Sequence, residues 1–222
     1  MSAVVARLLR PAAQRTYEKV FGLVHVALGA NVLLAAGCAP LLLALAVVRD
    51  PVASWPFFVV LSGCCAPALA GVFGCFAALD GGRVWRPFAD AYRRAAGRAL
   101  VAWYGGAAVL VVLAVDVVVV SRAAWGPAVV PLFATAAVLV VGTVVAVLVA
   151  TSAGTDRLRD LVWPCLCLVA RRWYLALANA VVLGLAVAAV LLQPVAGLLV
   201  ACAPLLYAVY ANTRVLLAGR AR

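Results

Sequence analysis

Six long apolar segments, separated by short polar connections, constrain this chain more than any other feature of its sequence. They cover residues 21–48, 55–79, 99–120, 127–150, 173–192 and 195–217. Each is about as long as the roughly 20 residues that an α-helix needs to cross a bilayer core of ~30 Å. Backbone polar groups in lipid must be bonded within their own segment, so each is expected to be a helix. The sequence therefore predicts an all-α, polytopic integral membrane helical bundle with six transmembrane helices in a single membrane domain, residues 1–222.

The composition excludes an ordinary soluble domain. Only 11% of the residues are charged and 68% are hydrophobic, whereas globular chains average about 25% charged residues. The net charge of +11 does not indicate nucleic acid, because the basic residues lie between apolar segments. We therefore expect the lipid bilayer as partner and no nucleic acid. Seventeen arginines stand against one lysine, which we interpret as GC-rich coding and hence as a sign of bacterial origin.

The basic residues also predict the orientation of the chain. Sixteen of the eighteen fall in the N-terminal segment 1–19, the connections 80–98 and 152–172, and the C-terminal end. The short connections hold only Arg49 and Arg122. With six spans the sixteen lie on one side, so the positive-inside bias predicts cytoplasmic N- and C-termini. In this topology 161–170, half a membrane thickness long and interrupted by Pro164, lies at the surface, and Gln193-Pro194 closes a tight antiparallel hairpin.

The segment 80–98 is the longest non-apolar interval and is predicted to contain an interfacial helix from near Pro87. Its apolar residues recur every three or four positions, which is typical of a helix that packs on one face. Two interpretations remain open. Its cations could simply fix orientation, since each contributes about 1 kcal/mol near an anionic leaflet. Alternatively, it forms a docking surface for a partner, for which the candidate residues are Trp85, Phe88, Tyr92, Arg93 and Arg94.

Five polar residues within the apolar segments are candidates for an intramembrane site: His25, Asn31, Asp116, Asn179 and Asn212. Asp116 is the only carboxylate in a span, and an ionisable group there is a functional candidate by default. It lies close to Ser121-Arg122, however, where water or an arginine could keep it charged. The asparagines and His25 could line an inner vestibule, or they could form interhelical hydrogen bonds of about 0.6 kcal/mol each.

No cofactor and no metal site are expected. The seven cysteines sit in apolar runs without the usual CxxC spacing, and we interpret them as small buried hydrophobes. No phosphate-binding loop, nucleophile motif or acid pair is present, so an enzyme is not predicted.

A family resemblance involves several of these segments. Asn31, Pro67-Ala68, Phe73, the loop WRPFADAYRR (85–94) and the later LRDLVWPCLCLVARRWYLALANA resemble the bacterial YesL-like membrane proteins, domain of unknown function 624. The resemblance implies a six-helix inner-membrane protein, often encoded near carbohydrate uptake transporters, and supplies no active-site residues. It suggests an accessory or stabilising factor for carbohydrate uptake, with carbohydrate ABC-type transporter subunits as partners. The alternative is a small-solute or ion transporter or channel that uses Asp116 and the inner polar residues.

Overall fold

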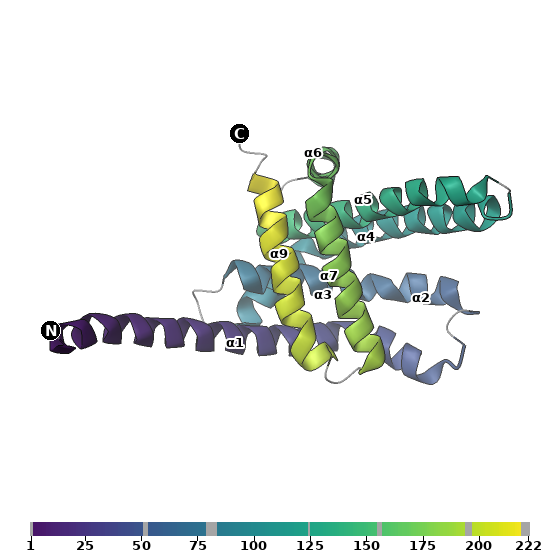
Figure 1. Cartoon of the computed structure of the whole chain (residues 1–222). Helices are drawn as coiled ribbons and strands as arrows, with labels where there is room; N and C mark the ends of the chain where they lie inside the picture. The colour runs from purple at the N-terminus through teal and green to yellow at the C-terminus, as the bar shows by residue number, and fades with distance from the viewer. Residues whose placement is uncertain are drawn as a thin grey trace.

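The computed structural model describes residues 2–50, 53–78, 84–123, 125–154, 157–193 and 197–218. Most of these residues are helical, and none of them forms a strand (Figure 1). The elements are α1 (Ser2–Val47), α2 (Trp55–Leu61), the 3₁₀ turn η1 (Ser62–Cys64), α3 (Cys65–Ala77), α4 (Trp85–Val120), α5 (Gly126–Ala153), α6 (Leu158–Arg171), α7 (Trp173–Leu192), the π turn η3 (Gly197–Ala201) and α9 (Cys202–Ala218). The prediction of an all-α chain is confirmed.

Within the described residues, five stretches are long and apolar enough to cross a membrane: Val24–Val47, Trp55–Ala77, Trp85–Val120, Gly126–Ala153 and Trp173–Leu192. They correspond to the first five predicted segments. The sixth, 195–217, is divided between η3 and the 17-residue helix α9. Several long apolar helices are what a multi-pass membrane protein requires.

At two predicted boundaries between an interfacial segment and an apolar segment, the helix continues without interruption. Residues 2–20 continue into the first apolar segment as one 46-residue helix, α1. Likewise, the interfacial segment 85–98 and the third apolar segment form the single 36-residue helix α4. At 1.5 Å per residue α4 is about 54 Å long, well beyond a ~30 Å core, so one end must leave the hydrocarbon. Arg83, Pro194, Arg220 and Arg222, used in the sequence argument, lie outside the described residues.

The second apolar segment is helical but interrupted. Residues Ser62–Cys64 tighten into a 3₁₀ turn before α3 begins at Cys65. Pro67 follows closely, and proline has no N–H to donate to the carbonyl four residues earlier. A short 3₁₀ stretch is a common way to join two helical pieces, so this apolar run is built as α2, η1 and α3.

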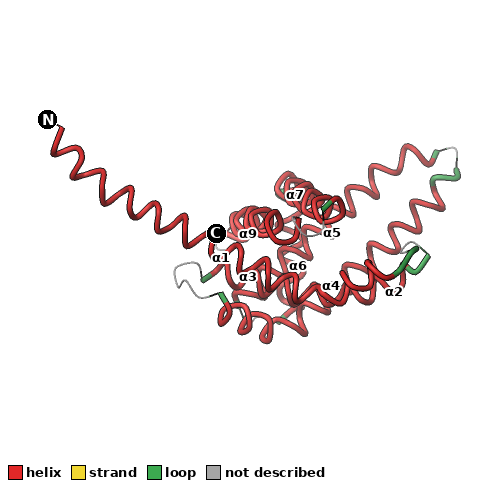
Figure 2. The backbone as a smooth tube through the Cα atoms, turned by 90° about the horizontal axis from the view of Figure 1, so that it is seen from below, coloured by secondary structure: helices red, strands yellow, loops and turns green. Residues whose placement is uncertain are grey.

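The helices form two groups that cross one another. Helices α1, α3, α4 and α5 make a layer, in which α3 packs on α1, α4 and α5. Helices α7 and α9 form the antiparallel hairpin that the sequence predicts and lie across this layer rather than along it (Figures 1 and 2). The hairpin contacts α5 through both of its helices, while η3 packs on α1. The α4–α5 pair extends well beyond the crossing (Figure 1).

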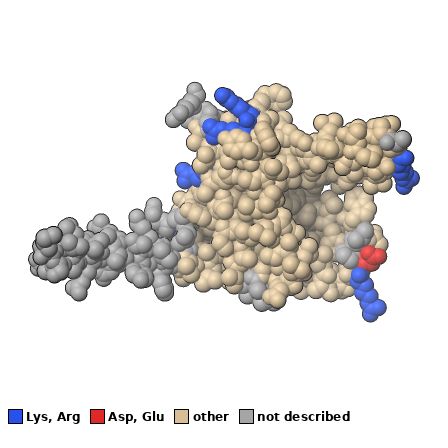
Figure 3. Space-filling view, viewed as in Figure 1, with Lys and Arg blue, Asp and Glu red and all other residues tan. Residues whose placement is uncertain are grey.

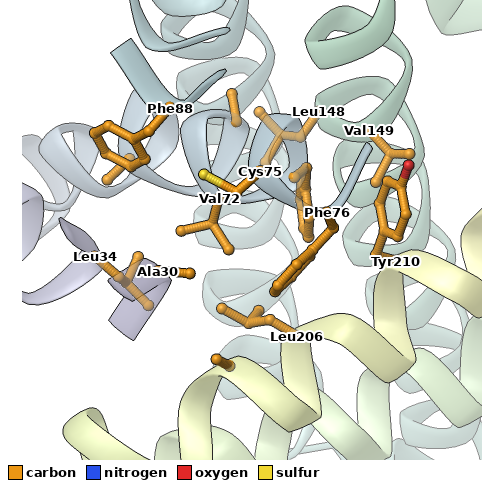
Figure 4. Packing of buried hydrophobic residues seen from close by; sticks show 14 of the residues in the cluster. Ala30, Leu34, Val72, Cys75, Phe76, Phe88, Leu148, Val149, Leu206 and Tyr210 are labelled. Carbon is orange, nitrogen blue, oxygen red and sulfur yellow. The ribbon is translucent and has the colours of Figure 1, made fainter. Parts of the chain in front are cut away.

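The main core lies where the two groups cross. Figure 4 shows Phe76 of α3 beside Leu206 and Tyr210 of α9. The ring centroids of Phe76 and Tyr210 are 5.8 Å apart, within the usual range for favourable aromatic pairs. Buried residues of α1, α4 and α5 complete the same cluster, so the hairpin is fixed to the layer by apolar side chains.

Candidate functional site

The first turns of α4 present an exposed aromatic and basic surface. We call it the α4 face and define it as Trp85, Arg86, Tyr92, Arg93 and Arg94, all of which are exposed. The Trp85 side chain is 69% exposed and Tyr92 is 36% exposed. Aromatic and arginine side chains are the types enriched at the centres of protein–protein interfaces. Four of the five predicted docking residues are therefore exposed on the first three turns of α4.

Phe88, the fifth predicted docking residue, belongs to the core instead. Its side chain is only 9% exposed, and it packs against α3 beside Gly71. Its ring stacks on Tyr92, with centroids 5.8 Å apart. The reason is helical register: Phe88, Ala91, Ala95 and Ala99 follow one stripe, and all four are buried. Phe88 thus anchors the α4 face but is not accessible to a partner.

The arginines at the end of this region turn back on their own helix. Arg94 Nε donates to the Asp90 carbonyl at 3.1 Å, and Arg98 Nη2 donates to the Arg94 carbonyl at 3.1 Å. Both bonds are exposed and span four residues. They hold both arginine side chains along the surface of α4.

A second polar cluster joins α7 to α9. Asn212 Nδ2 donates to Asn179 Oδ1 at 2.7 Å and to the Leu175 carbonyl at 3.1 Å. Asn179 Nδ2 in turn donates to Thr213 Oγ1 at 3.0 Å. Asn179 and Thr213 are both buried. The structure therefore brings Asn179 and Asn212 together as interhelical hydrogen-bond partners, which is the second of the two interpretations open from the sequence.

The other intramembrane candidates lie on α1 and α4. His25 is exposed on α1, and Asn31 is buried in the same helix. Asp116 is half-buried and lies four residues before the end of α4 at Val120, on the part of the α4–α5 pair that extends beyond the core. Its carboxylate makes no hydrogen bond or ion pair with another described residue. The structure thus gives no shared polar vestibule for His25, Asp116 and the α7–α9 asparagines.

Helix α6 covers the predicted surface segment. Leu161, Cys165 and Val169 are buried, whereas Trp163 is exposed. At 14 residues α6 is about 21 Å long and too short to span a ~30 Å core. It packs on α5, α7 and α9.

The cysteines are all free thiols. Four are buried (Cys38, Cys75, Cys165 and Cys202), two are half-buried, and Cys167 is exposed. The interpretation as buried hydrophobes therefore fails at Cys167, which is on the outer side of α6. Among the described residues, no group of three or more His, Cys, Asp or Glu side chains could hold a metal ion.

Sequence reasoning missed one feature, an apolar cleft between α2 and α4. It has a volume of about 310 Å³ and is lined by Trp55, Val111, Ala114, Val115, Val118 and Val119. Figure 3 shows a hollow on this side of the molecule, between the α4–α5 pair and the part that α1 and α2 form (compare Figure 1). The spacing of Val111, Val115, Val118 and Val119 is that of one face of a helix. The sequence alone does not indicate which element lies opposite this face.

Comparisons with protein-family models, curated proteins and solved structures found no match for this chain.

Proposed function

We propose that this chain is a non-enzymatic, multi-pass membrane protein that docks a partner protein through the α4 face. The observation that carries the proposal is that the first turns of α4 bury one aromatic side chain and expose two others together with three arginines. Phe88 is buried against α3, whereas Trp85 and Tyr92 are exposed on the same turns of the helix, as are Arg86, Arg93 and Arg94. A rigid helix that displays aromatic rings and arginines is suited to binding another protein.

The topology we propose has six spans with cytoplasmic N- and C-termini. It is supported by the charge distribution, with only Arg49 and Arg122 outside the basic segments. The crossing of the α7–α9 hairpin over the layer is compatible with it. Membrane helices tilt by up to about 40° from the normal, so two groups tilted in opposite directions can cross at about 80°.

The partner we propose is a membrane component of carbohydrate uptake, namely subunits of an ABC-type transporter in a bacterial inner membrane. This choice rests on the resemblance of the sequence to YesL-like proteins. The surface proposed to bind these subunits is the α4 face, which lies on the cytoplasmic side in the proposed topology. An accessory or stabilising role follows, because the protein would hold a partner without acting on a substrate.

The alternative, a small-solute or ion transporter or channel, has less support. Coupled carriers generally use ionisable groups that face a common cavity. Here Asn179 and Asn212 bond to one another, Asp116 makes no side-chain bond to a described residue, and the lining of the α2–α4 cleft is apolar.

The proposal is tested by affinity purification from native membranes in a mild detergent, with identification of the proteins that co-purify. We expect transporter subunits to co-purify with the wild-type chain. The Trp85→Ala/Tyr92→Ala variant should lose them by tenfold or more, because removing interface hot spots typically costs about 2 kcal/mol or more each.

Trp125→Ala is the matched control, because Trp125 is 60% exposed and lies at the opposite end of α4 from Trp85. It should retain the partner. Recovery of the chain alone, in wild-type and variant forms, would refute docking through the α4 face. Recovery of a different partner that depends on Trp85 and Tyr92 would retain docking but refute the carbohydrate-uptake assignment.

A further inference from the structure

Two hydrogen bonds join the helices α2 and α4 at the base of the cleft between them. Trp103 Nε1 donates to Ser62 Oγ at 3.0 Å, and the Tyr104 hydroxyl donates to the Val60 carbonyl at 2.6 Å. These bonds join α4 to the end of α2 and to η1. Beyond them toward Trp55 and Val119 the two helices separate, and the space is lined by the cleft residues. The cleft is therefore a defined feature between two tethered helices.

The chemistry of the cleft changes from apolar to cationic along its length. Its lining consists of alanine and valine side chains with the Trp55 indole. Beyond it, the α1–α2 connection carries Arg49 and the α4–α5 turn carries Arg122, and both are exposed. Asp50 lies beside Arg49 and keeps its negative charge while its Oδ1 accepts the Ala53 N–H at 3.1 Å, so these two residues together carry no net charge and Arg122 supplies the positive charge. A ligand that complements an apolar lining followed by a positive charge has an apolar chain and an anionic head.

We propose that this cleft binds one phospholipid with an anionic headgroup. One acyl chain lies between α2 and α4, against Val111, Val115 and Val119, and the phosphate lies near Arg122, three residues beyond Val119. The Trp55 ring, which is half exposed, lies at the level where amphipathic rings settle in a membrane. This inference is independent of the docking function and concerns the opposite end of α4 from the α4 face.

The dimensions of the cleft agree with this occupant. From Val111 to Val119 the helix rises by about 12 Å, close to half of a ~30 Å hydrocarbon core. The cleft thus matches the depth of a single leaflet. Its volume of about 310 Å³ falls at the lower end of the range for small-molecule sites, about 300–1,000 Å³.

The test uses the full chain in phosphatidylcholine vesicles that contain phosphatidylglycerol. Bromine atoms, which quench tryptophan fluorescence, are placed on the acyl chains of one lipid or the other at equal mole fraction. The Trp55 signal is obtained by subtracting the Trp55→Phe variant. We expect brominated phosphatidylglycerol to quench it with about a fivefold preference, the factor given by about 1 kcal/mol for a cation near an anionic headgroup.

Two variants and one control locate the lipid. Arg122→Gln should abolish the preference for phosphatidylglycerol. Ala114→Phe/Val118→Phe fills the cleft and should reduce quenching by both lipids. Val112→Phe is the control, because Val112 is exposed on the same helix but does not line the cleft; it should change neither result.

Three outcomes would overturn the proposal. Equal quenching by the two lipids would show that the headgroup is not selected. Quenching that survives filling of the cleft would place the lipid elsewhere. Quenching that disappears as the ratio of protein to lipid rises would show that a second copy of the chain covers the cleft instead.

Discussion

At the scale of single residues, close packing of α4 on α3 depends on glycine. A Cβ atom on Gly71 would lie 2.6 Å from Cε2 of the Phe88 ring, closer than real side chains approach. Gly105, on the exposed part of α4, has no atom within 4 Å of the same position. Two glycines in apolar helices therefore have different roles, and only the first is required for close approach.

Gly71→Ala is expected to lower the free energy of unfolding by about 1–3 kcal/mol, because the added methyl group must displace the Phe88 ring. Gly105→Ala should be neutral or stabilise by up to about 1 kcal/mol, since alanine is the better helix former. Unfolding by denaturing detergent in mixed micelles measures both. Equal effects of the two substitutions would contradict the role assigned to Gly71.

The hydrogen bond between Asn179 and Asn212 should be measurable as a coupling free energy between the two side chains. A double-mutant cycle with Asn179→Ala and Asn212→Ala is expected to give about 0.6 kcal/mol, and at most about 1.7 kcal/mol, as for other hydrogen bonds between membrane helices. A cycle with Asn179→Ala and Val112→Ala provides the control and should show no coupling. Additive effects at Asn179 and Asn212 would argue against a direct bond.

At the scale of elements, α4 and α6 show how one helix serves two environments. Helix α4 begins with the exposed α4 face and ends at the apolar cleft. Helix α6 buries Leu161, Cys165 and Val169 on one side. Its exposed side carries Arg159, Trp163 and Arg171, a combination typical of a helix at a membrane surface.

Leu161→Ala is expected to cost about 2–5 kcal/mol of unfolding free energy, because it leaves a cavity beneath α6. The neighbouring Val162→Ala should cost much less, since Val162 is exposed. The same detergent titration compares them. If both variants unfold at the wild-type midpoint, α6 is not docked on the layer in the way described.

At the scale of the whole molecule, the described connections alternate between the two ends of the α1–α5 layer. The turn from α4 to α5 lies at one end, and the end of α5 returns to the other (Figure 1). If α5 crosses the membrane, Ser121 and Gly154 lie on opposite sides of it. Both positions are exposed and can be tested in the intact protein.

We expect Ser121→Cys to react with a membrane-impermeant maleimide in intact cells, and Gly154→Cys to react only after permeabilisation. The native chain, with its exposed Cys167, supplies the background. Under the proposed topology Cys167 should itself be protected until permeabilisation. Labelling of both new cysteines from the same side would contradict a membrane crossing by α5.

The sequence alone predicted the class of fold and nearly all of the helical segments. Apolar runs of membrane length must be helical, because lipid offers their backbone no other hydrogen-bond partner. Residues 173–192, for example, correspond to α7 at both ends. The sequence also predicted a helix in the basic segment 80–98, because apolar residues recur there every three or four positions, and α4 begins at Trp85.

Only the tertiary structure decided which apolar faces meet. Phe88 and Tyr92 lie on adjacent turns with similar apolar character, yet one is buried because α3 offers the space beside Gly71. Asn179 and Asn212 are far apart in sequence and meet because α7 and α9 pack together. The cleft exists because hydrogen bonds at Ser62 and Val60 tether α4 at one point and leave the helices to diverge beyond it. A sequence specifies the periodicity of each helix, whereas the choice of neighbour depends on contacts between residues distant along the chain.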